Sequence, residues 1–399
     1  MTDAPLVDLG DLGFDEGAEI VLKRAVRDVD PGARVEVRGT HEAFSSHLRA
    51  FCRARGDTLD FTSDHRAVIT RAAVSTDRWR GATRAGHPDP SRPGALVERP
   101  PAWWGLAARG AAVEAGAPSF VFAPDAREVV WSEEVPRLYA QAAAAQWDPA
   151  TAIPWGERVE LAVEVEDAVV QVMTYLVENE TAALIVPARF ASRVHPHFRE
   201  VMQLLAIQAA DEARHIEVFT RRMLLYRELP GLSTAGGQAS LKTLVEEPHF
   251  DEASFLLSVL GEGSFLSLLW FLYEYGPDLV TREVARRAAQ DEARHVAFGL
   301  GHLAAQARRD PSLLGRLGVA IERRHAALQH TAGLNEEVHD ALVLLAAGSL
   351  DPVALRAGAA RVQRLVADMD DGRRARLRRL GFSDDEARGL SALHTRNFM

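Results

Sequence analysis

The chain has 399 residues, 47% of them hydrophobic, which is enough for two domains or for one large domain with a sizeable core. A formal net charge of −10, with basic residues spread along the chain, disfavours nucleic acid or a membrane as the main partner. Because Cys52 is the only cysteine, the chain alone cannot hold an intrachain disulfide, an iron–sulfur cluster, a rubredoxin-type centre or a Cys-rich zinc site. The acidic N-terminus lacks the layout of a secretion signal, so we expect a cytoplasmic protein.

Residues 1–75 alternate strand and helix signals, which predicts a small α/β domain of βαβαββ order. In chain order, we expect strand 6–12, helix 17–29, strand 33–39, helix 42–55 and strands 58–63 and 66–72. This order resembles the TusA-like sulfur-carrier fold, most clearly at DPGARVEVRG and HLRAFCRARGD. That family works through a Cys-Pro pair at the start of its first helix, where this chain has Gly13-Phe14-Asp15, and Cys52 lies in the second helix. The resemblance therefore implies the fold without sulfur transfer; the alternative is a small α/β unit of another kind.

The remainder of the chain is expected to be mainly α-helical. A linker is predicted at 76–130, since Gly, Pro and Arg are abundant in its first part, and a ferritin-like four-helix bundle at 131–310. Additional helices are expected to form a C-terminal extension at 311–399. The long connection at 228–250 has the place of the crossover that joins the two helix pairs of such a bundle. The expected helices are 132–146, 157–187, 197–227, 251–275, 278–309, 311–332, 335–347, 352–367, 371–380 and 384–392.

One pentapeptide, Asp-Glu-Ala-Arg-His, occurs twice in strongly helical context, at 211–215 and at 291–295. Its Glu and His are three residues apart, so they share one face of a helix and can point at the same metal ion. A single Glu-x-x-His pair is weak, because most such pairs lie on a solvated helix face. Two identical copies are a much stronger indication of a dinuclear metal site, which needs one such pair from each of two helices. The predicted ligands are Glu212, His215, Glu292 and His295.

Such a site also needs one glutamate from each of two further helices. The most apolar run, 253–273, is nearly long enough to span a bilayer, but Glu262 lies at its centre. A buried helix is the better interpretation, and a carboxylate buried there must become neutral, pair with a cation or bind a metal. In the earlier helix, Glu180 shares a face with the apolar stripe, whereas Glu178 points to nearly the opposite side. Glu180 and Glu262 are therefore the predicted partners.

The other motif residues are predicted to support the ligands. A metal-bound imidazole usually donates its second N–H to a carboxylate, so we expect the pairs Asp211–His295 and Asp291–His215. Arg214 and Arg294 can balance these aspartates, and the alternative for all four is an ordinary surface salt bridge. Further candidates near the site are Gln208 and Tyr175. Trp147 and Trp155 either pack the bundle or carry electrons, and His195 and His197 are expected at the surface or as helix caps.

The set Glu180, Glu212-x-x-His215, Glu262 and Glu292-x-x-His295 resembles the carboxylate-bridged diiron family of oxygenases, desaturases and oxidases. The resemblance implies two iron ions, with manganese as the alternative metal, that react with O2 and oxidise an organic substrate. It also implies an external electron donor, either a ferredoxin or a flavoprotein reductase, since the chain has no Gly-rich dinucleotide motif. A homodimer is a further expectation.

Several members of this family are disfavoured by single positions. Ribonucleotide reductase small subunits place a radical tyrosine where this chain has Phe219, and one class of N-oxygenases places a seventh ligand where it has Ala288. Rubrerythrins need cysteines that are absent here, and ferritins are far shorter. The leading hypothesis is an oxygenase, desaturase or oxidase. The alternative is a ferritin-like iron- or manganese-binding or oxidant-scavenging protein without an organic substrate.

Overall fold

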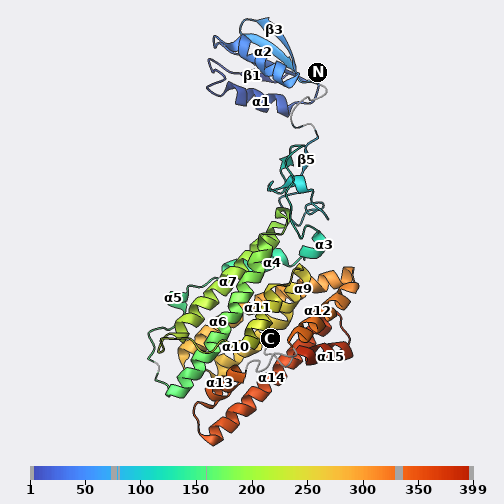
Figure 1. The fold of residues 1–399 in the computed structure, drawn as a ribbon. Helices are drawn as coiled ribbons and strands as arrows, with labels where there is room; N and C mark the ends of the chain where they lie inside the picture. Colours follow the sequence, from blue (N-terminus) through green and yellow to red (C-terminus); the bar gives the residue numbers. More distant parts are fainter. Residues whose placement is uncertain (1–3, 73–78, 80, 159, 329–335, 395–399) are drawn as a thin grey trace. The chain divides into compact units, whose positions relative to one another are not determined.

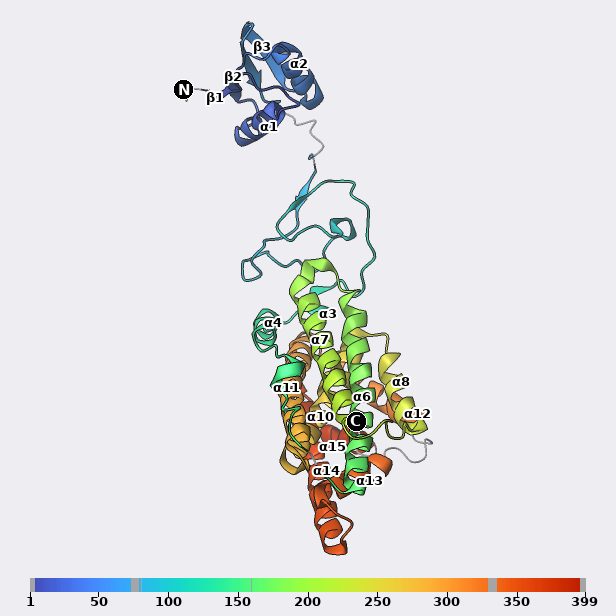
Figure 2. The same cartoon turned by 90° about the vertical axis from the view of Figure 1, so that its left-hand side faces the viewer.

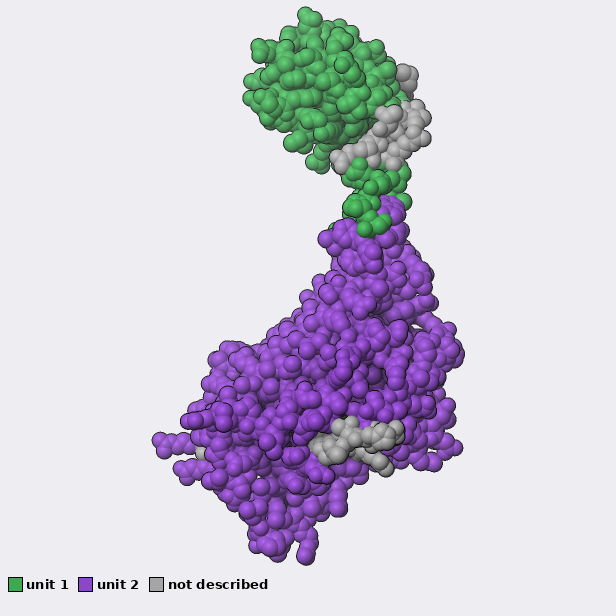
Figure 3. Space-filling model, viewed as in Figure 1, with its two compact units in different colours: residues 1–89, 107–119 green, residues 90–106, 120–399 purple. Residues whose placement is uncertain are grey.

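The computed structural model describes residues 4–72, 79, 81–158, 160–328 and 336–394 (Figure 1). The chain divides into two compact units, and each is described by itself below. One comprises residues 1–89 and 107–119, and the other residues 90–106 and 120–399 (Figure 3).

The first unit contains a four-stranded sheet built from β1 (Leu6–Asp8), β2 (Arg34–Arg38), β3 (Thr58–Ser63) and β4 (Arg66–Thr70), with helices α1 (Ala18–Asp28) and α2 (Phe44–Arg55). The strand order is β1-β2-β4-β3; β1 pairs with β2 in parallel and the other pairs are antiparallel. Side chains alternate along β2, so that Val35 and Val37 are buried with Leu22, Leu48 and Ile69. The predicted βαβαββ order is confirmed, while the likeness to sulfur carriers stays a prediction.

The stretch predicted as a linker contains structure of its own. In the first unit, β5 (Thr83–Arg84) pairs with β6 (Ala112–Val113). In the second unit, the short elements η1 (Ala102–Trp104) and α3 (Arg127–Val130) precede the bundle, and Leu96 and Val130 belong to its hydrophobic core. A composition rich in Gly and Pro disfavours long helices, but it does not prevent single apolar side chains from packing. The domain boundaries at 75, 130 and 310 remain a proposal.

The second unit is a ferritin-like four-helix bundle with additional helices. Its central helices are α6 (Val163–Ala191), α7 (Arg199–Met223), α10 (Glu262–Tyr275) and α11 (Leu279–Arg309). They run side by side, with α6 packed on α7, α10 on α11, and α11 on α7 (Figures 1 and 2). The predicted bundle is therefore confirmed. The short elements α4 (Val135–Ala144), α5 (Pro149–Ala152) and η2 (Pro196–Phe198) flank it, and α8 (Ala235–Val245) forms within the connection that was expected to be a plain crossover.

The helix predicted at 251–275 is not regular. It begins as α9 (Phe250–Ser254), continues as the seven-residue π-helix η3 (Phe255–Gly261) and then becomes α10. Such insertions are rare and often lie at functional sites. Arg376 Nε donates to the carbonyl of Val259 at 2.6 Å, and Gly263 lacks the Cβ that would collide with this guanidinium. The π-helix therefore ends immediately before Glu262, whose side chain it helps to orient.

The C-terminal extension contains α12 (Ser312–Leu328), α13 (Glu336–Ala347), α14 (Pro352–Leu380) and α15 (Asp384–His394). The prediction of two helices at 352–367 and 371–380 is wrong, because α14 is continuous. Leu365, Met369 and Leu377 are buried at helical spacing across the expected break.

Two helices among the described residues, α6 and the run Phe250–Tyr275, are long and apolar enough to cross a membrane. A third span would result if α13 and α14, bent by 118° at their junction, were taken together. The apolar windows of the first two are 67% and 83% buried inside the protein. Burial in a bundle therefore accounts for their composition.

His302 on α11 provides a pH-dependent contribution to stability. It is fully buried between the rings of Phe250 and Phe298, and burial lowers its pKa from 6.5 to about 4. The unfolded chain therefore binds more protons than the folded one between these values, so stability falls as the pH falls. When the pH is lowered from 7 to 5, we expect His302 to reduce the free energy of unfolding by about 2 kcal/mol.

Urea unfolding of wild type and of His302→Leu at both pH values measures this contribution. The variant should lose about 2 kcal/mol less than wild type on acidification. His339→Leu is the matched control, because this imidazole is 49% exposed. This variant should lose as much stability on acidification as wild type does. Equal acid sensitivity of wild type and His302→Leu would contradict the assignment.

Candidate metal centre

The structure brings the six predicted metal-ligand residues together in the middle of the four-helix bundle. One glutamate comes from α6 and one from the start of α10, and α7 and α11 each contribute a Glu-x-x-His pair. Residues three or four positions apart lie next to each other on one face of a helix, so the Glu and the His of each motif both point into the bundle. All six side chains are between 0 and 4% exposed. They are Glu180, Glu212, His215, Glu262, Glu292 and His295.

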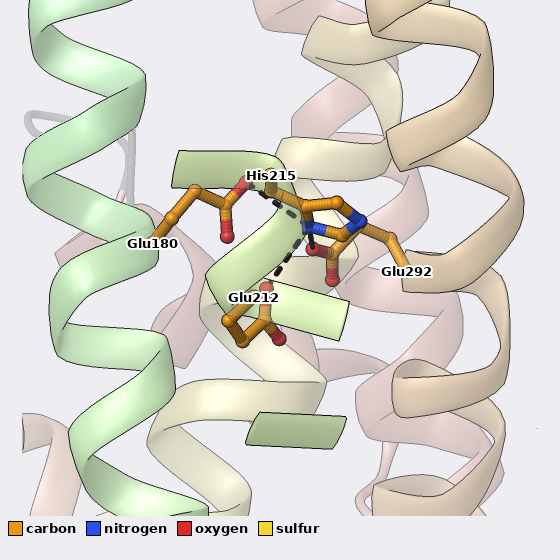
Figure 4. A group of neighbouring side chains, drawn as sticks. All are labelled: Glu180, Glu212, His215 and Glu292. Carbon is orange, nitrogen blue, oxygen red and sulfur yellow. Dashed lines mark hydrogen bonds and ion pairs between the residues drawn. The ribbon is translucent and has the colours of Figure 1, made fainter. Parts of the chain in front are cut away.

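The first ligand group is formed by Glu180, Glu212, His215 and Glu292, with one ligand atom of each lying within 4.8 Å of the others (Figure 4). His215 Nδ1 lies 3.0 Å from Glu212 Oε2, 3.4 Å from Glu292 Oε1 and 3.6 Å from Glu180 Oε1. One imidazole nitrogen thus faces three carboxylates from three helices.

The second ligand group is formed by Glu212, Glu262, Glu292 and His295 under the same distance limit. His295 Nδ1 lies 3.0 Å from Glu212 Oε1, 3.3 Å from Glu292 Oε2 and 3.9 Å from Glu262 Oε1. Glu212 and Glu292 belong to both groups, and each presents one oxygen to each imidazole. These two carboxylates are therefore placed to bridge a pair of cations, with one terminal glutamate and one histidine on each side.

The aspartate preceding each motif glutamate contacts the histidine of the opposite motif, as the sequence predicted. His215 Nε2 lies 3.3 Å from Asp291 Oδ2, and His295 Nε2 lies 3.2 Å from Asp211 Oδ2. A proton on Nε2 that is donated to the aspartate leaves Nδ1 as the nitrogen available to a metal ion between the glutamates. With metal bound, this arrangement would hold both imidazoles in the tautomer that coordination requires.

The two motif arginines hold the aspartates. Arg214 pairs with Asp211 on its own helix and lies 3.4 Å from Asp291, and Arg294 pairs with Asp291 and lies 3.7 Å from Asp211. Because the arginine side chains are only 13 and 16% exposed and the aspartates at most 2%, these are not ordinary surface salt bridges.

Two further side chains contact these aspartates. Trp147 Nε1 donates to Asp291 Oδ2 at 2.7 Å, which links the indole through Asp291 to His215. Gln146 Nε2 donates to Asp211 Oδ1 at 3.0 Å. Gln146 was missed by the sequence reasoning, since a glutamine at the end of a short helix carries no periodic signal. Trp155 instead donates to the carbonyl of Pro149 at 2.8 Å and packs there.

The other candidates lie at different distances from the ligands. Gln208 Nε2 donates to Glu262 Oε1 at 2.9 Å and so orients a ligand side chain directly. Tyr175 is buried, but its ring packs against Phe265, with centroids 5.8 Å apart, rather than on any of the six predicted ligands. Phe219 is buried, with its ring centroid 6.2 Å from that of His215.

The expectation of a surface position for His195 and His197 is wrong, because both are 2% exposed. The expectation of a capping role is confirmed for His195, whose Nδ1 accepts from the backbone N–H of His197 at the start of η2. His197 Nε2 instead accepts from the backbone N–H of Val97, which belongs to no helix, and neither imidazole lies in a ligand group.

Electrostatics favour cations between the ligands. Burial and the neighbouring carboxylates raise the pKa of Glu180 and of Glu262 well above the usual value. Burial by itself would lower the pKa of His215 and His295, but the surrounding carboxylates raise both well above the ordinary imidazole value. The imidazolium protons thus balance glutamate charge in the metal-free chain, and binding of metal would release them.

The donor set fits two divalent ions. The four glutamates together would carry four negative charges, which two divalent cations would neutralise. Both carboxylate oxygens of Glu292 are buried and have no hydrogen-bond donor among the described residues. A buried carboxylate that accepts no hydrogen bond is costly, and coordination to metal would remove this cost.

A third acidic group differs from this centre. Glu247, His249 and Glu252 also place ligand atoms within 4.8 Å of one another, but Arg323 lies against both carboxylates, at 2.5 and 2.7 Å. The guanidinium already supplies positive charge there, so this acidic group needs no metal ion.

No family model matches the chain, and no curated protein matches it. Solved structures of R2-like ligand-binding oxidases are similar to it at low identity. One variant with an aerobically reconstituted Mn/Fe cofactor has 16% identity over 67% of this chain and 93% of its own, with a TM-score of 0.44. A form with a metal cofactor after photoconversion has 17% identity over 67% and 92%, with a TM-score of 0.43. A variant with an anaerobically reconstituted Mn/Fe cofactor has 17% identity over 64% and 93%, with a TM-score of 0.45. Because these identities and TM-scores are low, the argument for a metal centre depends on the arrangement of the side chains in this chain.

Proposed function

We propose that this chain is an O2-dependent oxidoreductase that works with two metal ions, held by Glu180, Glu212, His215, Glu262, Glu292 and His295. The observation that supports this most is the sharing of Glu212 and Glu292 by two buried ligand groups with one histidine each. This is the arrangement expected when two cations lie side by side.

The ligand chemistry favours iron. Carboxylate oxygens and imidazole nitrogens form a set that suits Fe(II) and Fe(III), and manganese accepts the same carboxylate ligands. We propose two iron ions, with a Mn/Fe pair as the alternative. When bound, such a pair supplies the electrons that reduce O2.

The chain's own residues would hold this centre in place and keep water out. Asp211 and Asp291 orient the imidazoles, and Gln208 orients Glu262. The π-helix and the apolar helices around it cover the ligands. Phe219 stands at the position where a radical tyrosine would be needed, so we propose a reaction without a stable tyrosyl radical.

Substrate and electrons must come from outside the chain. We propose that the substrate is organic, that a ferredoxin or a flavoprotein reductase supplies the electrons, and that the protein works in the cytoplasm. Cys52 is a single, buried cysteine, so the N-terminal unit holds no cysteine pair or cluster that could supply electrons. The contacts from Trp147 through Asp291 to His215 offer electrons a short path to the centre. We also propose a homodimer.

The same ligands would also serve a ferritin-like iron or manganese protein that removes oxidants without an organic substrate. Turnover separates the two functions. Full-length protein loaded with iron should bind about two ions per chain and, when an organic substrate and a chemical reductant are supplied, consume O2 repeatedly together with the substrate. Accumulation of many irons per chain would support the alternative, and absence of bound metal would refute both.

A further inference from the structure

Arg376 on α14 lies against the backbone next to the proposed metal ligand Glu262. Its Nε donates to the carbonyl of Val259, in the second half of the π-helix, at 2.6 Å. Gly263 makes this close approach possible, because a Cβ at that position would lie only 2.5 Å from Cζ of the guanidinium. The arginine side chain therefore occupies the space that any larger residue at 263 would need.

Arg373, about one turn earlier on α14, contacts the first turn of α10. Its Nη1 donates to Ser264 Oγ at 3.0 Å, and that hydroxyl donates to the carbonyl of Leu260 at 2.8 Å. Its Nε donates to Ser391 Oγ at 3.0 Å, and Ser391 donates to Asp370 at 2.6 Å. Arg373 is 2% exposed, and both serines are fully buried. The carbonyls of two consecutive residues of the π-helix, 259 and 260, are thus both tied to α14.

These two arginines are an expensive way to pack one helix against another. Burial lowers the pKa of each guanidinium to about 10, so both stay charged at neutral pH, and the charge of Arg373 further lowers the pKa of Arg376. Arg376 Nη2 is buried and has no hydrogen-bond partner among the described residues. Because apolar side chains would pack there without this desolvation cost, the hydrogen bonds to the π-helix require an explanation.

The backbone that the arginines contact sets the direction of Glu262. The N–H of Glu262 donates to the carbonyl of Leu257, five residues earlier, which is the hydrogen bond of a π-helix. In an α-helix this N–H would donate to the carbonyl of Ser258, and the side chain of Glu262 would turn by about 100° around the helix axis. Such a turn would remove Glu262 from the amide of Gln208 and from the second ligand group.

We propose that Arg376 and Arg373 are positioning residues for the metal centre: by binding the carbonyls of η3, they keep the π-helix from becoming an α-helix and so hold Glu262 towards the second ion. The inference rests on the proposed function, because it concerns the ligands of that same site. It gives the C-terminal extension a role, since α14 provides no member of either bundle ligand group but packs against η3, α10 and α11. Only the second ligand group contains Glu262, so the effect should fall mainly on one ion.

The test measures Mn(II) binding to the full-length, metal-free protein by isothermal titration calorimetry and electron paramagnetic resonance. Arg376→Met removes the donor but keeps a long side chain. It should weaken one of the two binding steps by about tenfold or more and leave the other close to wild type. At a Mn(II) concentration where wild type shows the resonance of two coupled ions, the variant should show that of a single ion. Arg376→Lys keeps an N–H donor and should retain most of the wild-type affinity.

Two further variants complete the experiment. Arg378→Met is the matched control, since Arg378 is on the same helix, 53% exposed and paired with Asp384, and it should bind both ions as wild type does. Gly263→Ala displaces the guanidinium of Arg376 while adding a residue that favours helix, so it should weaken the same single step. Thermal unfolding of the metal-free forms shows which variants fold.

Each outcome decides the proposal. Wild-type affinity for both ions in folded Arg376→Met overturns it. Equal weakening of both steps also overturns it, because a general loss of packing would affect the two ions alike. If Arg376→Met does not fold, Gly263→Ala decides in the same way. Wild type that binds two ions but, once loaded with iron, does not consume O2 refutes the proposed function alone, whereas wild type that binds no metal refutes both.

Discussion

Replacing Glu212 with Gln is expected to empty both metal positions, whereas replacing Glu180 with Gln should empty mainly one. Glu212 belongs to both ligand groups, so its loss removes a bridging carboxylate from each ion. Glu180 belongs to the first group only, and Glu262, Glu292 and the rest of the second group stay intact. Metal analysis should therefore give about two ions per chain for wild type, about one for Glu180→Gln and well under one for Glu212→Gln.

Glu178→Gln is the matched control for this experiment. It lies on the same helix as Glu180, is only half-buried and belongs to neither group, so its metal content should equal that of wild type. The metal-free forms provide a folding check. Despite burial, both imidazoles contact Glu212 and hold its pKa below the usual value, so metal-free Glu212→Gln should unfold more easily than metal-free wild type while keeping a cooperative transition. Equal metal loss in Glu180→Gln and Glu212→Gln would contradict the bridging arrangement.

Helical periodicity explains why so much of the centre could be predicted. Glu212 and His215 are one turn apart, so any helix that buries one of them on this face presents the other. Glu180 was preferred over Glu178 because it lies on the apolar stripe, and Glu180 is the one that lies in a group able to hold a metal ion. The cross-pairing of Asp211 with His295 followed from the need of a metal-bound imidazole for an acceptor.

What the sequence did not predict depends on contacts between distant segments. Gln146 reaches Asp211 across 65 residues, and no local pattern indicates that pair. The π-helix is a change in backbone hydrogen bonding inside an apolar run whose side chains look the same for either kind of helix. One contact that distinguishes the π-helix is the hydrogen bond from Arg376 to the carbonyl of Val259. It joins residues more than a hundred positions apart, so no local sequence pattern indicates it.

The buried cations were missed for the same reason. Arginines are usually exposed, so Arg324 and Arg222 carry no burial signal in a sequence that has many arginines. Their surroundings differ, however. Arg324 has no carboxylate partner among the described residues, while Arg222 lies between two. Removing the charge of Arg324 should therefore leave no carboxylate unpaired, whereas removing the charge of Arg222 should leave two carboxylates unpaired.

Replacing Arg222 with Met is expected to destabilise the bundle by about 3–5 kcal/mol. Its guanidinium is fully buried and donates to both carboxylate oxygens of Glu166 at 2.8 and 2.9 Å, to Asp278 at 2.9 Å and to Thr281 at 2.8 Å. Methionine fills a similar volume but leaves two carboxylates buried without their cation. Thermal unfolding should show a fall in the melting temperature of about 6–20 °C.

The neighbouring Arg221 gives a matched control, because its side chain is exposed and its guanidinium lies 4.1 Å from the ring centroid of Trp155. Arg221→Met should cost only about 0.5–1 kcal/mol. Adding Glu166→Gln and Asp278→Asn to Arg222→Met should restore part of the lost stability, since the uncompensated charges are then gone. If the triple variant is no more stable than Arg222→Met, the stability lost in Arg222→Met comes from packing and not from unpaired charge. The contrast with Arg324 then fails.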